Sequence, residues 1–203
     1  MIPAQLLFLP GATGNSGFWQ PVASLLSHRA TPVLMTYAGF GATPADPAVD
    51  SFDDLVDHVV ARIDKPTALV AQSIGGVLAL AAALESPLLI THLVLTVTSG
   101  GIDTKALGAK DWRTDFAAAY PQLPRWLLDF SADLSRRLPA VKAPTLLLWG
   151  DDDPLSPVSV GGRLQALLPN ASLHVLPGGK HDLAYAMADR VAPLIVEHIF
   201  RGP

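Results

Sequence analysis

The chain has 203 residues, half of them apolar and 16% charged, which is the composition of a globular domain with a sizeable core rather than of a disordered chain. The formal net charge of −4 gives no reason to expect nucleic acid or an anionic membrane as a partner. The sequence contains no cysteine, which excludes disulfides, thiolate metal sites and thiol nucleophiles.

Short apolar runs alternate along the chain with longer segments of helical spacing. The runs have the length of strands and are apolar on both faces, at residues 6–9, 32–36, 68–71, 92–97, 145–149 and 173–176. The helical segments are residues 18–28, 51–64, 74–85, 158–168 and 182–200. This alternation predicts one α/β domain over residues 1–203, with a mostly parallel sheet of about six strands and helices on both faces.

One connection is much longer than the others. Between the runs that end near Val97 and begin near Thr145 lie about 46 residues, far more than an ordinary loop. Two apolar stripes at helical spacing fall there, consisting of Trp112, Phe116 and Tyr120, and of Leu123, Trp126, Leu127, Phe130 and Leu134. They predict two short helices, which either belong to the core or form a small helical cap, residues 98–143, over the carboxyl edge of the sheet.

The start of the chain carries no basic segment followed by a long apolar one, so no secretion signal is predicted. No stretch of about 18 uncharged apolar residues suggests a membrane span. We therefore expect a cytoplasmic protein without a membrane partner, and its oligomeric state stays open.

A serine stands where the third run meets the following helix, within residues 71–76 (AQSIGG). At such a sharp turn the Ser73 hydroxyl projects above the sheet, and the residues two before and two after it must be small, as Ala71 and Gly75 are. The N–H of Ile74 opens the helix and points at the same place, with the helix dipole behind it. The serine could instead be an ordinary helix N-cap.

Two further loops carry possible partners for that serine. Residues 149–157 (WGDDDPLSP) follow an apolar run with three carboxylates that could orient a histidine, cap the next helix or bind a cation. The spacing lacks the glycine and the distal glutamate of a calcium loop. Residues 176–182 (LPGGKHD) place His181 on a glycine-rich loop before the last helix, a position that no other histidine in the chain shares. A histidine on such a loop could also be a plain surface residue.

Serine, acid and histidine thus follow three different strands in the chain order of the α/β-hydrolase triad. The sequence resembles that family over essentially its whole length. Gly150, Asp153 and Pro157 have the spacing of the family's acid loop, so the resemblance implies Asp153 as the acid, beside Ser73 as nucleophile and His181 as base. Asp103, which follows the fourth run, is the alternative acid.

The resemblance also extends to the loop after the first run. Residues 10–12 stand where the family often has His-Gly-x, which implies the Ala12 N–H as the second donor of an oxyanion hole, beside Ile74. The family sheet usually has eight strands, and this sequence begins at what would be the third. We therefore expect an α/β-hydrolase fold without the first two strands.

The implied activity is that of a serine hydrolase, which cleaves a small to medium acyl ester of a small-molecule substrate through an acyl-enzyme, without a cofactor or a metal. Trp112, Phe116 and Trp126 would line the substrate pocket. Thioesters and some C–C bonds are cleaved by the same arrangement of residues, so these substrates stay open. A catalytically inactive member that serves as a binding module is a further alternative.

The glycine-rich loop at residues 11–17 (GATGNSG) supports a rival interpretation, because it resembles the nucleotide loop of extended short-chain dehydrogenases/reductases, which bind NAD(P). Two observations oppose that interpretation. The second run is followed by no acidic residue that could bind a ribose and by no arginine for a 2′-phosphate. No tyrosine is followed four residues later by the lysine with which such reductases pair it.

Overall fold

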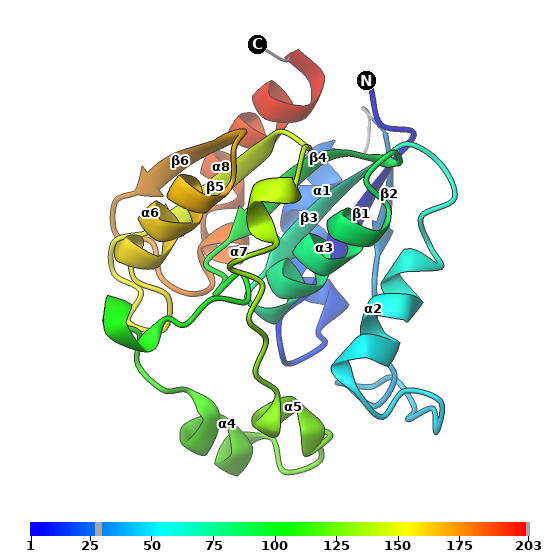
Figure 1. Ribbon diagram of the computed structural model, residues 1–203, viewed down its shortest axis with the longest axis vertical. Helices are drawn as coiled ribbons and strands as arrows, with labels where there is room; N and C mark the ends of the chain where they lie inside the picture. The colour runs from blue at the N-terminus through cyan, green and yellow to red at the C-terminus, as the bar shows by residue number, and fades with distance from the viewer. Residues whose placement is uncertain (27–29, 202–203) are drawn as a thin grey trace.

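The computed structural model describes residues 1–26 and 30–201. One sheet of six parallel strands, in the order β2-β1-β3-β4-β5-β6, lies between two layers of helices (Figure 1). The strands are β1 (Gln5–Leu9), β2 (Thr31–Leu34), β3 (Thr67–Gln72), β4 (Ile90–Thr96), β5 (Thr145–Gly150) and β6 (Ala171–Leu176). The expected parallel α/β sheet of six strands is therefore confirmed.

Helices cover both faces of the sheet, with α2, α3 and α6 on one side and α1 and α8 on the other (Figure 1). The α-helices outside the long insert are α1 (Gln20–Leu26), α2 (Phe52–Val60), α3 (Ile74–Glu85), α6 (Val158–Leu167), α7 (Leu183–Ala186) and α8 (Ala188–Val196). A 3-10 turn, η1 (Ser16–Trp19), leads into α1, and a π-helical turn, η4 (Glu197–Arg201), follows α8.

The structure differs from the sequence-based expectation at element ends and at the sheet edges. The segment 182–200 is not one helix, because the backbone of Met187 leaves the helical region and separates α7 from α8. The segment 18–28 begins as a 3-10 turn, and its last two residues lie outside the described ranges. The strands β2 and β6, at the two edges of the sheet, are partly exposed rather than buried on both faces.

Helix α3 occupies the centre of the molecule. Its first ten residues are all buried, so it has no solvent-facing side of the kind that an amphipathic surface helix presents. It packs on the strands β1, β3 and β4 and against α2. Its amino end is therefore fixed by the core itself, at the carboxyl edge of the sheet, where parallel α/β folds bind ligands.

The residues between β4 and β5 form an insert that projects from the carboxyl edge of the sheet, on the side away from both chain ends (Figure 1). It contains η2 (Lys105–Leu107), α4 (Arg113–Ala119), α5 (Trp126–Asp129) and η3 (Leu138–Ala140), so the two expected helices are present but short. The Arg113 guanidinium donates to the carbonyls of Leu128 and Phe130 and lies over the Trp112 ring, which ties the two halves of the insert together.

None of the helices in the described part of the chain combines the length and the hydrophobicity that crossing a membrane requires.

A pair of histidines packs at the opposite, amino end of the sheet. The rings of His92 in β4 and His198 meet edge to face with their centroids 5.3 Å apart. Nδ1 of His92 has no hydrogen-bond partner among the described residues. Burial, and then the charge that His198 would carry, lower the pKa of His92 to about 4. His92 therefore stays neutral in the folded protein over a range where an exposed histidine takes up a proton.

We predict an acid-dependent loss of stability from this pair. Because the folded pKa lies below the unfolded value of about 6.5, the unfolded state binds more protons below that pH. The stabilisation is complete above about pH 6.5 and falls, by up to about 3 kcal/mol, as the pH approaches 4. Thermal unfolding of the wild type and of His92→Gln at several pH values measures this. The wild type should lose more stability between pH 6.5 and 4.5, and parallel curves would contradict the prediction.

Candidate active site

Ser73 sits at the sharp turn between β3 and α3, in a backbone conformation that non-glycine residues seldom adopt, with φ 54° and ψ −122°. Close packing around the turn explains the small residues beside it. A Cβ on Gly75 would stand 2.5 Å from the Pro10 carbonyl oxygen, and one on Gly76 would stand 2.6 Å from the Thr98 side chain. The turn thus requires glycine at both places and lifts the serine above the sheet edge.

The three loops that the sequence singles out converge at this turn. His181 Nε2 lies 3.1 Å from Ser73 Oγ, and His181 Nδ1 lies 2.8 Å from Asp153 Oδ2. The Asp153 side chain is fully buried, whereas the imidazole is 29% exposed. With Nδ1 donating to the carboxylate, Nε2 is free to accept the serine proton. The arrangement is therefore a continuous hydrogen-bonded series from the buried Asp153 through His181 to the hydroxyl of Ser73, which lines a cavity.

The neighbouring carboxylates have other partners. Asp151 accepts a hydrogen bond from the N–H of Gly178, and Asp152 lies 3.8 Å from the Lys180 ammonium. Both side chains therefore help to hold the acid loop against the loop that carries His181. The alternative acid, Asp103, is exposed and accepts from the N–H of Lys105 at the start of η2. Among the four candidates, only Asp153 reaches the imidazole.

The two backbone donors expected for an oxyanion hole both line the cavity in front of Ser73. Ala12 belongs to the loop after β1, and Ile74 is the first residue of α3. Within the described residues, neither N–H donates a hydrogen bond to another protein group. Gly11 faces the serine so closely that an added Cβ would collide with the side chain of Gln72 and stand 3.3 Å from Ser73 Cβ. Two unpaired donors thus lie beside the Ser73 side chain.

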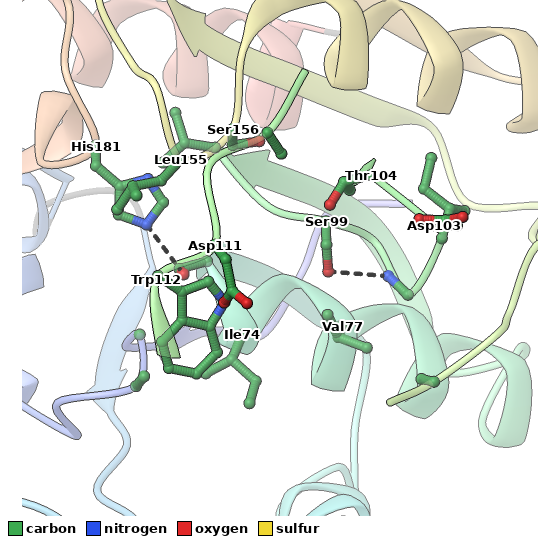
Figure 2. Close-up of a pocket in the computed structure, with 18 of the residues that line it drawn as sticks. Ile74, Val77, Ser99, Asp103, Thr104, Asp111, Trp112, Leu155, Ser156 and His181 are labelled. Carbon is green, nitrogen blue, oxygen red and sulfur yellow. Dashed lines mark hydrogen bonds between the residues drawn. The ribbon is translucent and has the colours of Figure 1, made fainter. Parts of the chain in front are cut away.

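The cavity has a volume of about 1060 Å³ and is roofed by the insert. Trp112 and Phe116 line it as expected and meet edge to face. Figure 2 draws Trp112 on the His181 side of the cavity and Ser99, Thr104 and Asp103 at its other end. Trp126 differs from the expectation, because α5 turns its ring against Phe40 on the loop after β2, away from the cavity.

Sequence reasoning missed two side chains of the site. Gln72 is buried, and its amide donates to the carbonyl of His181, so it links the serine turn to the histidine loop. Its place directly before Ser73 was the available signal. Phe18 lines the cavity and stacks against Tyr185. Nothing in the local pattern distinguishes Phe18 from a core residue of the first helix.

No group of three or more histidine, aspartate or glutamate side chains that could hold a metal ion occurs within residues 1–26 and 30–201.

Comparison with known proteins gives the family and the fold. A sequence model of the alpha/beta hydrolase family matches residues 6–194. A serine hydrolase of Mus musculus, BPHL, is 27% identical over 96% of this chain and 78% of its own length. A 2-hydroxy-6-oxononadienedioate/2-hydroxy-6-oxononatrienedioate hydrolase of Burkholderia vietnamiensis is 26% identical over 95% of this chain and 84% of its own length.

Solved structures of similar fold include a thermophilic esterase from Thermogutta terrifontis, with a TM-score of 0.81 and 17% identity, covering 99% of this chain and 91% of the esterase. Another is the meta-cleavage product hydrolase of Pseudomonas fluorescens, with a TM-score of 0.78 and 21% identity, covering 100% and 93%. At these identities the likeness concerns the fold. This likeness in fold does not support the nucleotide-binding interpretation of residues 11–17. In the structure, Gly11 of that loop faces Ser73.

The geometry predicts that Ser73 is unusually nucleophilic and that Asp153, not Asp103, supports it. A small alkyl fluorophosphonate should modify Ser73, as peptide mass spectrometry can verify. The Asp153→Asn variant keeps the shape of the buried side chain but favours the wrong imidazole tautomer, so it should slow labelling by up to about 10⁴-fold. Asp103→Asn is the matched control and should label at the wild-type rate. Equal slowing in both variants would contradict the assignment.

Proposed function

The chain belongs to the alpha/beta hydrolase family, and from that premise we propose that it is a serine hydrolase that cleaves small to medium acyl esters through an acyl-enzyme. The observation that carries the proposal is the hydrogen-bonded chain from Asp153 through His181 to Ser73 at the edge of the cavity. A hydroxyl is a poor nucleophile at neutral pH unless a base takes its proton. In the proposal, His181 is that base and Asp153 is the acid that orients it.

In the proposed mechanism, Ser73 Oγ attacks the ester carbonyl while His181 Nε2 takes the hydroxyl proton. The buried Asp153 carboxylate stabilises the imidazolium that forms. The imidazolium then protonates the departing alcohol, which leaves an acyl group on Ser73. A water molecule, deprotonated by the same imidazole, then attacks the acyl-enzyme. As the bond to Ser73 Oγ breaks, the imidazolium returns the proton to Oγ and the carboxylic acid leaves.

The negative oxygen of each tetrahedral intermediate would lie between the N–H groups of Ala12 and Ile74. Both groups are unpaired in the described protein and flank the serine. Donors that are already oriented stabilise the developing charge without reorganisation, and losing one such donor typically costs about 3–4 kcal/mol of transition-state stabilisation. The amino end of α3 adds its dipole at the same place, because Ile74 is the first residue of that helix.

The size and lining of the cavity suit an acyl or alcohol group of moderate size. Its volume is near the upper end of the roughly 300–1,000 Å³ that is common for small-molecule sites. Apolar side chains of the insert and of α3, among them Trp112, Phe116 and Val77, line the cavity together with charged side chains of the insert. A compact apolar group suits this lining better than a long lipid chain held at an interface.

Cleavage of a C–C bond is a second candidate, favoured by the similarity to the Burkholderia vietnamiensis hydrolase over most of both chains. Cleavage of a C–C bond would use the same serine, histidine and acid. An activity assay must therefore include substrates with either bond type. Thioesters belong in the same assay, because a thiolate leaving group needs no catalytic group beyond those that an alcohol leaving group needs.

We predict that p-nitrophenyl esters are hydrolysed with kcat/KM rising from acetyl to medium acyl chains and falling for hexadecanoyl. Ser73→Ala should lose at least about 10⁴-fold in kcat, since the hydroxyl is the proposed nucleophile. Ser172→Ala, which removes an exposed hydroxyl on β6, should keep the wild-type rate. Rates that rise steadily to hexadecanoyl and jump when micelles form would contradict the proposed substrate size. Activity that survives in Ser73→Ala would refute the nucleophile.

A further inference from the structure

Two buried aromatic side chains hold the base of the loop that carries Ala12. The Trp19 indole donates from Nε1 to the Leu9 carbonyl, at 2.9 Å, and the Tyr37 hydroxyl donates to the Pro10 carbonyl, at 3.0 Å. Both side chains are completely buried. Buried polar atoms of this kind are costly to leave unpaired, so each hydrogen bond fixes the carbonyl that it reaches.

The same two carbonyls touch the helix that begins at the nucleophile. A Cβ on Gly75 would lie 2.5 Å from the Pro10 oxygen and 2.7 Å from the Leu9 oxygen. The two oxygens are therefore contacted by the first turn of α3 as well as by the two aromatic donors. Their position sets the distance between the loop after β1 and the serine turn.

The loop provides only part of this rigidity, because its own turn holds the Gly11 carbonyl, which shares a peptide with the Ala12 N–H, through the Gly14 N–H. Gly11 follows Pro10 directly and has no side chain to restrict its torsions, so the peptide between them is not held by local sterics. Ala12 N–H belongs to the next peptide, and its direction depends on those same torsions. The preceding peptide, between Pro10 and Gly11, is held from outside the loop, because the Tyr37 hydroxyl donates to the Pro10 carbonyl.

The segment that contains Tyr37 supports the loop at a second place. Phe40 packs edge to face on the Tyr37 ring, and its Cβ fills the space where a side chain on Gly14 would stand. Gly14 in turn closes a tight turn by donating to the Gly11 carbonyl, at 2.9 Å. Residues 37–41 thus pack directly against residues 11–14.

We propose that Tyr37 is a positioning residue of the oxyanion hole, whose hydroxyl aims the Ala12 N–H by holding the Pro10 carbonyl, with Trp19 doing the same one residue earlier. The inference rests on the proposed serine hydrolase function and deepens it. Burial raises the pKa of Tyr37 well above its usual value, so the hydroxyl stays a donor throughout the working range of the enzyme.

The test compares Tyr37→Phe with the wild type on a p-nitrophenyl ester and on the thionoester in which sulfur replaces the carbonyl oxygen. Sulfur accepts hydrogen bonds poorly, so hydrolysis of the thionoester depends little on the oxyanion hole. The variant should lose about tenfold in kcat on the ester, with KM within about twofold, because a misaimed donor costs less than an absent one. On the thionoester the loss should stay below about threefold.

Tyr120→Phe is the matched control, since it removes an exposed hydroxyl at the end of α4, and both of its rates should equal the wild type. Trp19→Phe breaks the neighbouring hydrogen bond and should shift the ester-to-thionoester ratio in the same direction. Equal losses on both substrates, or an unchanged kcat on the ester, would overturn the role of Tyr37 while leaving the hydrolase function intact. A wild type that cleaves neither substrate and is not labelled at Ser73 would overturn both.

Discussion

The close contact between the first turn of α3 and the ends of β1 and β4 is the constraint on which the site depends. Gly75 meets the carbonyls of Leu9 and Pro10, and Gly76 meets the side chain of Thr98, with no room for a Cβ at either place. This packing holds Ser73 at a positive φ and places the loop after β1 beside Ser73. The strain at the serine is maintained by the surrounding core, because α3 is buried along almost its whole length.

The parallel sheet then supplies the partners. Because all six strands run in the same direction, the loops after β3, β5 and β6 open at one edge, and each carries one member of the hydrogen-bonded chain. Asp153 is buried and His181 is partly exposed, which suits the proposed roles of a fixed carboxylate and of an imidazole that exchanges protons with substrate and water. The insert closes the cavity from above, and Trp126 contacts Phe40 on the segment that backs the β1 loop.

Much of this could be predicted from the sequence, because the signals are local. Ser73 and His181 stand beside glycines just after apolar runs, and Asp153 has the spacing of the family's acid loop. Other features depend on contacts between distant segments. The direction in which the Trp126 side chain points could not be predicted. Helix α5 has only 4 residues, too few for a hydrophobic pattern to fix which side of the helix is buried. Likewise, the hydrogen bond from Tyr37 joins residues 27 positions apart and leaves no mark in either local sequence.

Mass spectrometry of an acid-quenched reaction tests most directly whether Ser73 carries the acyl group during turnover, which is the central claim. The protein is mixed for milliseconds with a p-nitrophenyl ester in excess, quenched and digested. We expect an acyl adduct on the peptide that contains Ser73, formed together with a burst of p-nitrophenol that approaches one equivalent if deacylation is the slower step. An adduct on another residue, or turnover of the ester in Ser73→Ala with no adduct at all, would contradict it.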